Sequence, residues 1–136
     1  MKKILSAICI CALMLIVNSC KKSASGATGE LTIVGDWELA SIAGMGGMVP
    51  SVAGSGNTLH LTSASYIQHQ SDTLFDKGNY TIVRDYTVNS FPMAGAITLN
   101  GSIGVRHANF YMQVNNTLTL DFGSAFDAPV YMYKRK

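Results

Sequence analysis

The sequence predicts an all-β domain, folded as an eight-stranded antiparallel up-and-down barrel, with a β-sandwich as the alternative arrangement. Three observations lead to this fold class. Apolar and polar residues alternate with a period of two in short runs from residue 31 onward, which is the pattern of half-buried strands. Turn-forming residues separate the runs, and no stretch after residue 29 has a helical period. A barrel is favoured because closing the sheet removes the exposed edges that promote aggregation.

The first four runs lie before residue 85. In the first of them, Trp37 and Leu39 alternate with acidic residues. Ser63-Ala64-Ser65 can close a hairpin between the second and third runs, and Gly78-Asn79 interrupts the chain before the fourth. These patterns predict strands around residues 37–39, 59–61, 66–70 and 80–83.

The last four runs follow a bend that Pro92 and Gly95 bracket. Asn115-Asn116 lies between two alternating runs and is suited to a tight hairpin, because Asn tolerates a positive φ. The predicted strands lie around residues 97–99, 110–114, 118–122 and 130–135.

The histidines do not suggest a metal site. A hairpin centred on Ala64 places Leu61 opposite Ile67 and Leu59 opposite His69. In this register His60 and His69 point to opposite faces of the sheet, whereas a metal needs at least two ligands on one face. We therefore expect His60, His69 and His107 to be structural or exposed, with no bound metal.

The N-terminus has the features of an export signal. Lys2 and Lys3 precede an uncharged apolar run, residues 4–17, whose length of 14 residues is short of the roughly 20 that a spanning helix needs. The run Val17-Asn18-Ser19-Cys20 resembles the lipobox of bacterial lipoproteins. The resemblance implies cleavage before Cys20, diacylation of its thiol and acylation of the new amine.

These features divide the chain into three parts. Residues 1–19 form the expected signal peptide, residues 20–29 the lipidated cysteine with a small, polar, flexible tether, and residues 30–136 the barrel domain. Cleavage of 19 from 136 residues leaves 117, a length that suits one domain.

Cleavage also changes the charge and the cysteine content. Loss of Lys2 and Lys3 leaves eight basic and eight acidic residues, so no basic field remains to attract nucleic acid. Cys9 and Cys11 leave with the signal, and Cys20 carries lipid, so neither a disulfide nor a thiolate metal site is expected.

The domain resembles the lipocalins. Gly35-Asp36-Trp37 looks like the Gly-x-Trp motif that opens that family, and residues 131–135 are similar to the last strand of small bacterial lipocalin-like lipoproteins. The resemblance implies that Trp37 packs at the closed end of the barrel and that Arg135 covers its indole ring.

Residues 43–57 occupy the position of the lipocalin lid. The segment contains five glycines and no charge, and Met45, Met48 and Val49 give it apolar contact surface. We expect a mobile lid over the barrel mouth, with a slack, functionless loop as the alternative.

Three further residues complete the expected ligand site. His69 is assigned to the inner face, and Tyr131 and Tyr133 share a face with Arg135, where they could hold an anionic head group. The alternative for the tyrosines is a packing role in the core or at the barrel rim.

The expected function is the binding of one small, mostly apolar ligand in the barrel mouth. The alternative is an envelope protein-interaction or inhibitor module with a filled barrel. No catalytic, nucleotide-binding or cofactor motif is found, so neither an enzyme nor a cofactor is expected. Lys21 after Cys20, without an acidic run, favours the outer membrane, facing the periplasm.

A modification site is also suggested. Asp72-Thr73-Leu74 resembles the short sequon for O-glycosylation of exported proteins in some Gram-negative bacteria. The resemblance marks Thr73 as the acceptor.

Overall fold

A computed structural model of the chain describes residues 32–44, 46–87, 90–123 and 128–136. The expected signal peptide, Cys20 and the tether lie outside these residues, as does Met45. No helix in the described ranges is long and apolar enough to cross a membrane.

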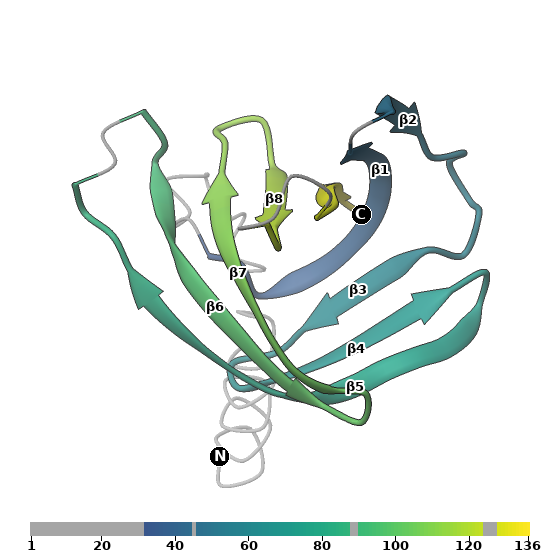
Figure 1. Cartoon of the computed structure of the whole chain (residues 1–136), viewed down its shortest axis with the longest axis horizontal. Coiled ribbons are helices and arrows are strands. Elements are labelled where there is room, and N and C mark those ends of the chain that lie inside the picture. Colours follow the sequence, from purple (N-terminus) through teal and green to yellow (C-terminus); the bar gives the residue numbers. More distant parts are fainter. Residues whose placement is uncertain (1–31, 45, 88–89, 124–127) are drawn as a thin grey trace, which may run out of the picture. The chain divides into compact units, whose positions relative to one another are not determined.

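The described residues form one antiparallel sheet that closes on itself (Figure 1). Its neighbours follow the order β2-β1-β3-β4-β5-β6-β7-β8-β9, and a further pairing of β1 with β9 completes the ring. The strands are β1 (Gly35–Gly44), β2 (Gly47–Pro50), β3 (Thr58–Leu61), β4 (Ser65–Gln70), β5 (Thr73–Arg84), β6 (Met93–Gly101), β7 (Gly104–Met112), β8 (Thr117–Asp121) and β9 (Val130–Arg135).

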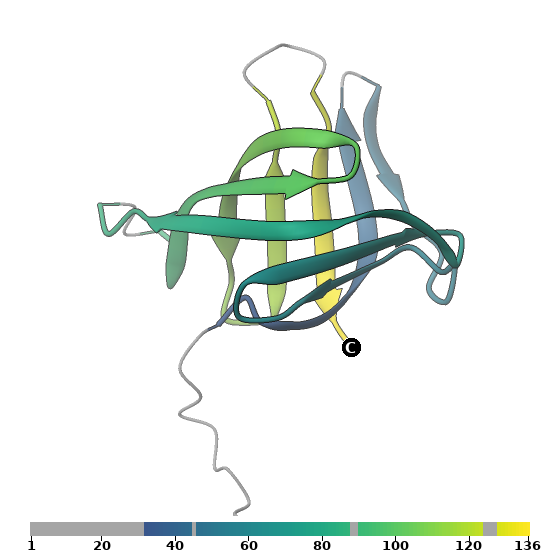
Figure 2. The ribbon, with the colours of Figure 1, turned by 90° about the horizontal axis from the view of Figure 1, so that it is seen from below.

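The predicted fold class is therefore confirmed. Eight strands make a closed up-and-down barrel of lipocalin-like type, and β2 is an additional strand that pairs only with β1. Because a single sheet closes through β1 and β9, the sandwich alternative does not apply. Figure 2 shows the long β5 and the adjoining β6–β7 hairpin crossing in front of β8, β9 and β1.

Inward-facing side chains fill most of the barrel. Every second residue is buried in the second half of β7 and along β8, as the alternation predicts. The largest fully buried side chains include Trp37, Tyr66, Phe110 and Met112. The core therefore leaves limited room for a ligand.

One end of the barrel is closed around Trp37, whose side chain is completely buried. Its indole Nε1 donates a 2.8 Å hydrogen bond to the Ile33 carbonyl oxygen, which draws the segment before β1 across the barrel end. The guanidinium of Arg135 lies 4.4 Å from the centre of the indole ring. It also donates hydrogen bonds of 2.9 Å to the Val34 carbonyl and 2.6 Å to the Thr32 carbonyl.

Gly35 makes room for this arrangement. Its φ of +146° is unfavourable for other residues, and a Cβ atom there would lie 2.6 Å from Arg135 Nη1. The Gly-x-Trp sequence and Arg135 thus form one structural unit at the closed end.

We expect Arg135→Ala to lower the free energy of unfolding by about 1–2 kcal/mol, since it removes both a cation–π contact and two hydrogen bonds. Urea denaturation followed by circular dichroism measures the change. Lys134→Ala is the matched control, because Lys134 is exposed and should give a change of less than about 0.5 kcal/mol. Equal effects from the two variants would show that the contact with Trp37 contributes nothing.

The register predicted for the β3–β4 hairpin is wrong by one residue. Leu61 lies opposite Tyr66, and His60 opposite Ile67. The turn has two central residues rather than three, because the Thr62 backbone N–H donates to the Ser65 carbonyl and the Thr62 hydroxyl accepts from the Ser65 N–H. A one-residue shift exchanges the faces of a strand, so Tyr66 is buried and Ile67 is 38% exposed.

The prediction of a structureless lid over residues 43–57 is also wrong in its first half. β1 continues to Gly44, and β2 pairs back along it with Gly44 opposite Gly47. Gly47 has a φ of +97°, so this tight hairpin uses the glycines that suggested disorder. The remaining loop, residues 51–57, is attached to β1 by a hydrogen bond from the Leu39 N–H to the Asn57 carbonyl.

Candidate functional site

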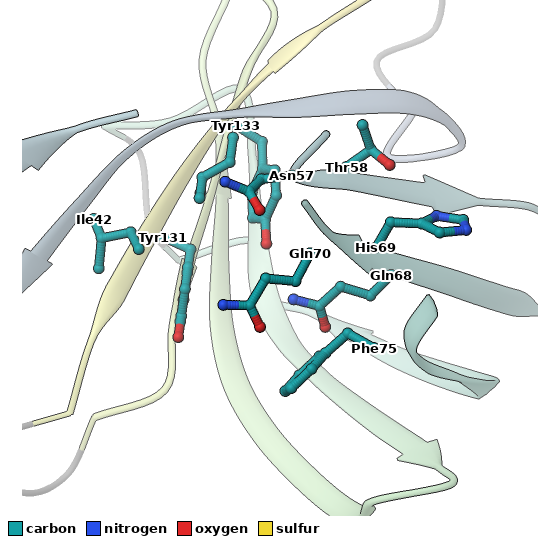
Figure 3. Close-up of a pocket in the computed structure, with 10 residues that line it drawn as sticks. Ile42, Asn57, Thr58, Gln68, His69, Gln70, Phe75, Tyr131 and Tyr133 are labelled. Atoms are coloured by element: carbon teal, nitrogen blue, oxygen red, sulfur yellow. The ribbon is translucent and has the colours of Figure 1, made fainter. Parts of the chain in front are cut away.

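A cavity of about 130 Å³ lies inside the barrel (Figure 3). The pairing of β1 with β9 places the lining residues Ile42 and Tyr131 farther along the barrel than Trp37 and Arg135. The cavity is lined by residues of β1, β3, β4, β5 and β9 and of the loop that precedes β3. The apolar lining residues are Leu39, Ile42 and Phe75, and the polar or amphipathic ones are Asn57, Thr58, Gln68, His69, Gln70, Tyr131 and Tyr133. Phe75 is 43% exposed, so the cavity reaches the surface at the barrel mouth.

Phe75 lines the cavity because of a β-bulge. Gln68 faces Asp76 and His69 faces Leu74, so Phe75 is an extra residue of β5 with no partner in β4. A bulge redirects side chains locally and lets Phe75 turn toward the mouth although the next residue, Asp76, also points into the barrel.

Two tyrosines of β9 form the opposite wall. Tyr131 and Tyr133 are two residues apart and share a face, with stacked rings whose centres are 6.4 Å apart. Phe122 packs edge-on against Tyr131 at 5.6 Å. Aromatic rings therefore border the cavity on both sides.

The Tyr133 hydroxyl is a polar group that faces the cavity from an otherwise buried side chain. The residue is only 3% exposed, and its hydroxyl makes no hydrogen bond with any residue in the described ranges. Figure 3 shows it pointing toward the side chains of Gln68 and Gln70. Burial raises the pKa of Tyr133 well above its ordinary value, so the hydroxyl stays protonated and can donate a hydrogen bond at neutral pH.

Next to the cavity, Asp76 is the centre of a buried polar network. Its carboxylate is completely buried and accepts hydrogen bonds from the Tyr66 hydroxyl at 2.5 Å and the Ser102 hydroxyl at 2.8 Å. Arg106 Nη2 lies 2.7 Å from the same carboxylate and also donates to Gln68 Oε1 at 3.1 Å. Through Arg106, the network thus connects the buried Asp76 to Gln68, which lines the cavity.

The surroundings of Asp76 keep it ionised. Burial alone would raise the pKa of its carboxyl, but hydrogen bonds from Tyr66, Ser102 and the Ile103 N–H, together with the Arg106 charge, lower the pKa to about 2. Asp76 and Arg106 therefore neutralise each other inside the barrel.

Gly101 provides the space for this network. A Cβ atom at Gly101 would overlap the Tyr66 hydroxyl and the Asp76 carboxylate. Sequence reasoning missed the network, because the predicted hairpin register turned Tyr66 outward. The sequence contained one signal for the network. Asp76 lies four residues before the buried Tyr80 on β5, so strand alternation places both side chains on the inner face.

The structure brings together only some of the residues predicted to bind ligand. Tyr131, Tyr133 and His69 border the cavity, but the His69 ring points away from Tyr131 in Figure 3. The assignment of His69 to the inner face is wrong, because His69 faces Thr58 and so lies on the side opposite the buried Leu59 and Leu61. Met48 and Val49 lie on β2, are more than 60% exposed and are not part of the lining.

Arg135 does not accompany the tyrosines into the cavity. It is engaged at the closed end by Trp37 and by two backbone carbonyls. The hypothesis that it joins Tyr131 and Tyr133 around an anionic head group is therefore wrong. Thr73, the candidate modification site, is the exposed first residue of β5.

The prediction that His60 and His69 point to opposite faces is wrong, because it rested on the wrong register. Facing residues in a sheet point to the same side, so His69, which faces Thr58, shares a side with His60. His60 lies 2.5 Å from the exposed Asp36 carboxylate, and His107 lies 3.0 Å from the Thr98 hydroxyl. Within the described residues, no three His, Cys, Asp or Glu side chains are grouped so that they could hold a metal ion.

The fold and the site define a small lipocalin-like barrel with a cavity at its mouth. Comparisons with protein-family models, with curated proteins and with solved structures find no match to this chain.

Proposed function

We propose that this chain is a lipid-anchored protein of the Gram-negative cell envelope whose barrel binds one small, mostly apolar ligand at its mouth. The proposal of ligand binding rests on the cavity between Phe75 and the tyrosines of β9. Its volume of about 130 Å³ is close to that of an apolar protein cavity of roughly 150 Å³ that holds benzene. A ligand built around a single ring is therefore the size that fits.

The location is proposed from the N-terminal sequence. The charged start, the short apolar run and Cys20 favour export and acylation, and Lys21 favours the periplasmic face of the outer membrane. Two or more acyl chains would provide a firm anchor, because each buried methylene contributes about 0.8 kcal/mol.

We expect Cys20→Ala to abolish acylation and to leave an uncleaved precursor. Metabolic labelling with a fatty-acid analogue, followed by electrophoresis, would detect both changes. Ser19→Ala is the matched control, because it keeps a small residue before the cysteine and should still be labelled and cleaved. Persistent labelling of the Cys20→Ala variant would contradict the assignment.

Ligand binding can be tested with toluene, which matches the cavity in size. We expect toluene to shift the NMR signals of Phe75 and Tyr131 in the mature chain held in lipid nanodiscs. Phe75→Ala should weaken binding several-fold, since it removes one aromatic wall. Met48→Ser is the control and should bind like the parent, because Met48 is exposed outside the cavity. The proposal fails if neither Phe75 nor Tyr131 responds.

The alternative function is a protein-interaction or inhibitor module that acts through its outer surface. It is favoured by the extensive side-chain filling of the barrel and by exposed apolar residues where β5 ends, with Val83 71% and Tyr86 82% exposed. The toluene experiment separates the two functions, because an interaction module needs no response in the cavity.

A further inference from the structure

The composition of the cavity wall narrows the class of ligand. The wall contains three amide side chains and two phenols, yet none of its residues is Asp, Glu, Lys or Arg. The Asn57 amide is already hydrogen-bonded to Ser55 and Ser71, and Gln70 is exposed. A purely apolar ligand would still leave the Gln68 NH₂ group and the Tyr133 hydroxyl without partners, and a charged ligand would find no counterion among the lining residues. The wall therefore differs from both a lipid-tail pocket and an anion site.

Two hydrogen-bond donors on this wall are left for a ligand. Gln68 Oε1 accepts from Arg106, and because a guanidinium can only donate, the Gln68 amide oxygen must face Arg106. Its NH₂ group is then left for the cavity. The second donor is the hydroxyl of the buried Tyr133 side chain, which lines the cavity and has no partner among the described residues.

The charged residues next to the cavity do not make it an anion site. Arg106 is the cation next to the cavity, and its Nη2 is engaged with the buried Asp76 carboxylate at 2.7 Å and with Gln68, whereas its buried Nε has no hydrogen-bond partner among the described residues. Since this pair is neutral as a whole, an anion entering the cavity would lose its hydration without gaining a free positive charge.

We infer that the cavity takes a small neutral molecule with one planar ring and a carbonyl-type acceptor, with the acceptor held by Tyr133 and Gln68 and the ring between Phe75 and Tyr131. This inference rests on the proposed binding function and adds the chemical class of the ligand.

The test compares three probes of similar size on the mature chain in nanodiscs: benzamide, benzoate and toluene. NMR titration at pH 7, read from Phe75 and Tyr131, gives each dissociation constant. We expect benzamide to bind more tightly than both toluene and benzoate. Tyr133→Phe should weaken benzamide binding by about threefold to tenfold, the range for one lost hydrogen bond, and should leave toluene binding unchanged.

Tyr80→Phe is the matched control variant. The Tyr80 hydroxyl donates a 2.5 Å hydrogen bond to the Thr62 carbonyl, away from the cavity lining. Its removal should lower the melting temperature without changing benzamide binding. Tyr133→Phe should show the opposite behaviour, with altered binding and an unchanged melting temperature, which a merely structural hydroxyl would not show.

The outcomes separate this inference from the proposed function. Tighter binding of toluene or benzoate than of benzamide, or equal benzamide binding by Tyr133→Phe and the parent, would overturn the neutral-acceptor inference while the binding function stands. If none of the three probes perturbs Phe75 or Tyr131, both are overturned.

Discussion

Replacement of Trp37 by alanine should lower the free energy of unfolding by about 3–5 kcal/mol, because it removes a fully buried indole and leaves a cavity at the closed end. Small domains have total stabilities of about 5–15 kcal/mol, so the variant should be close to unfolding at 37 °C. The change would also remove the hydrogen bond to Ile33 and the ring under Arg135.

Urea denaturation followed by circular dichroism measures this effect without relying on tryptophan fluorescence. Val83→Ala serves as the control, since Val83 is 71% exposed and should change stability by less than about 0.5 kcal/mol. An unchanged denaturation midpoint for Trp37→Ala would contradict the packing of the closed end.

Asp76→Ala should have an effect of similar size, about 3–5 kcal/mol, because it leaves Arg106, Tyr66 and Ser102 without their buried acceptor. The double variant Asp76→Ala with Arg106→Met should be more stable than Asp76→Ala alone, since it also removes the unpaired charge. Asp36→Ala is the control, because the Asp36–His60 pair is exposed and should contribute less than about 1 kcal/mol. A double variant less stable than Asp76→Ala would contradict this account of the network.

The same carboxylate should make stability depend on acid pH. Its pKa is lowered to about 2 in the folded chain, from an ordinary value of 3.8. The stabilisation is therefore complete above about pH 4 and is lost as the pH falls through 2, a contribution of roughly 2 kcal/mol. Asp76→Asn should show a shallower loss of stability between pH 5 and pH 2 than the parent. Parallel pH curves for the two chains would count against this linkage.

The fold was predictable because alternation and turn residues agree along most of the chain. Asn116 adopts a φ of +59° in the turn before β8, as expected from Asn115-Asn116. The contact of Arg135 with Trp37 also corresponds to what the lipocalin resemblance implied. The turn was predictable from adjacent residues, and the contact of Arg135 with Trp37 from two short motifs, so neither required the register of the strands between them.

The features that escaped prediction depend on single-residue shifts. Ser63, Ala64 and Ser65 tolerate turns of either length, so the turn alone does not determine whether Tyr66 or Ile67 points inward. β2 lacks alternation and consists of residues that read as a glycine-rich loop. The cavity wall depends on the bulge at Phe75, which leaves no clear trace in the periodicity.

The most direct test of the central claim is a crystal structure of the chain under xenon pressure, because xenon occupies small cavities that side chains leave open. The proposed function predicts a xenon peak inside the barrel mouth, bordered by Phe75, Tyr131 and Tyr133. A mouth in which these side chains close the space and no xenon binds would contradict ligand binding in the barrel.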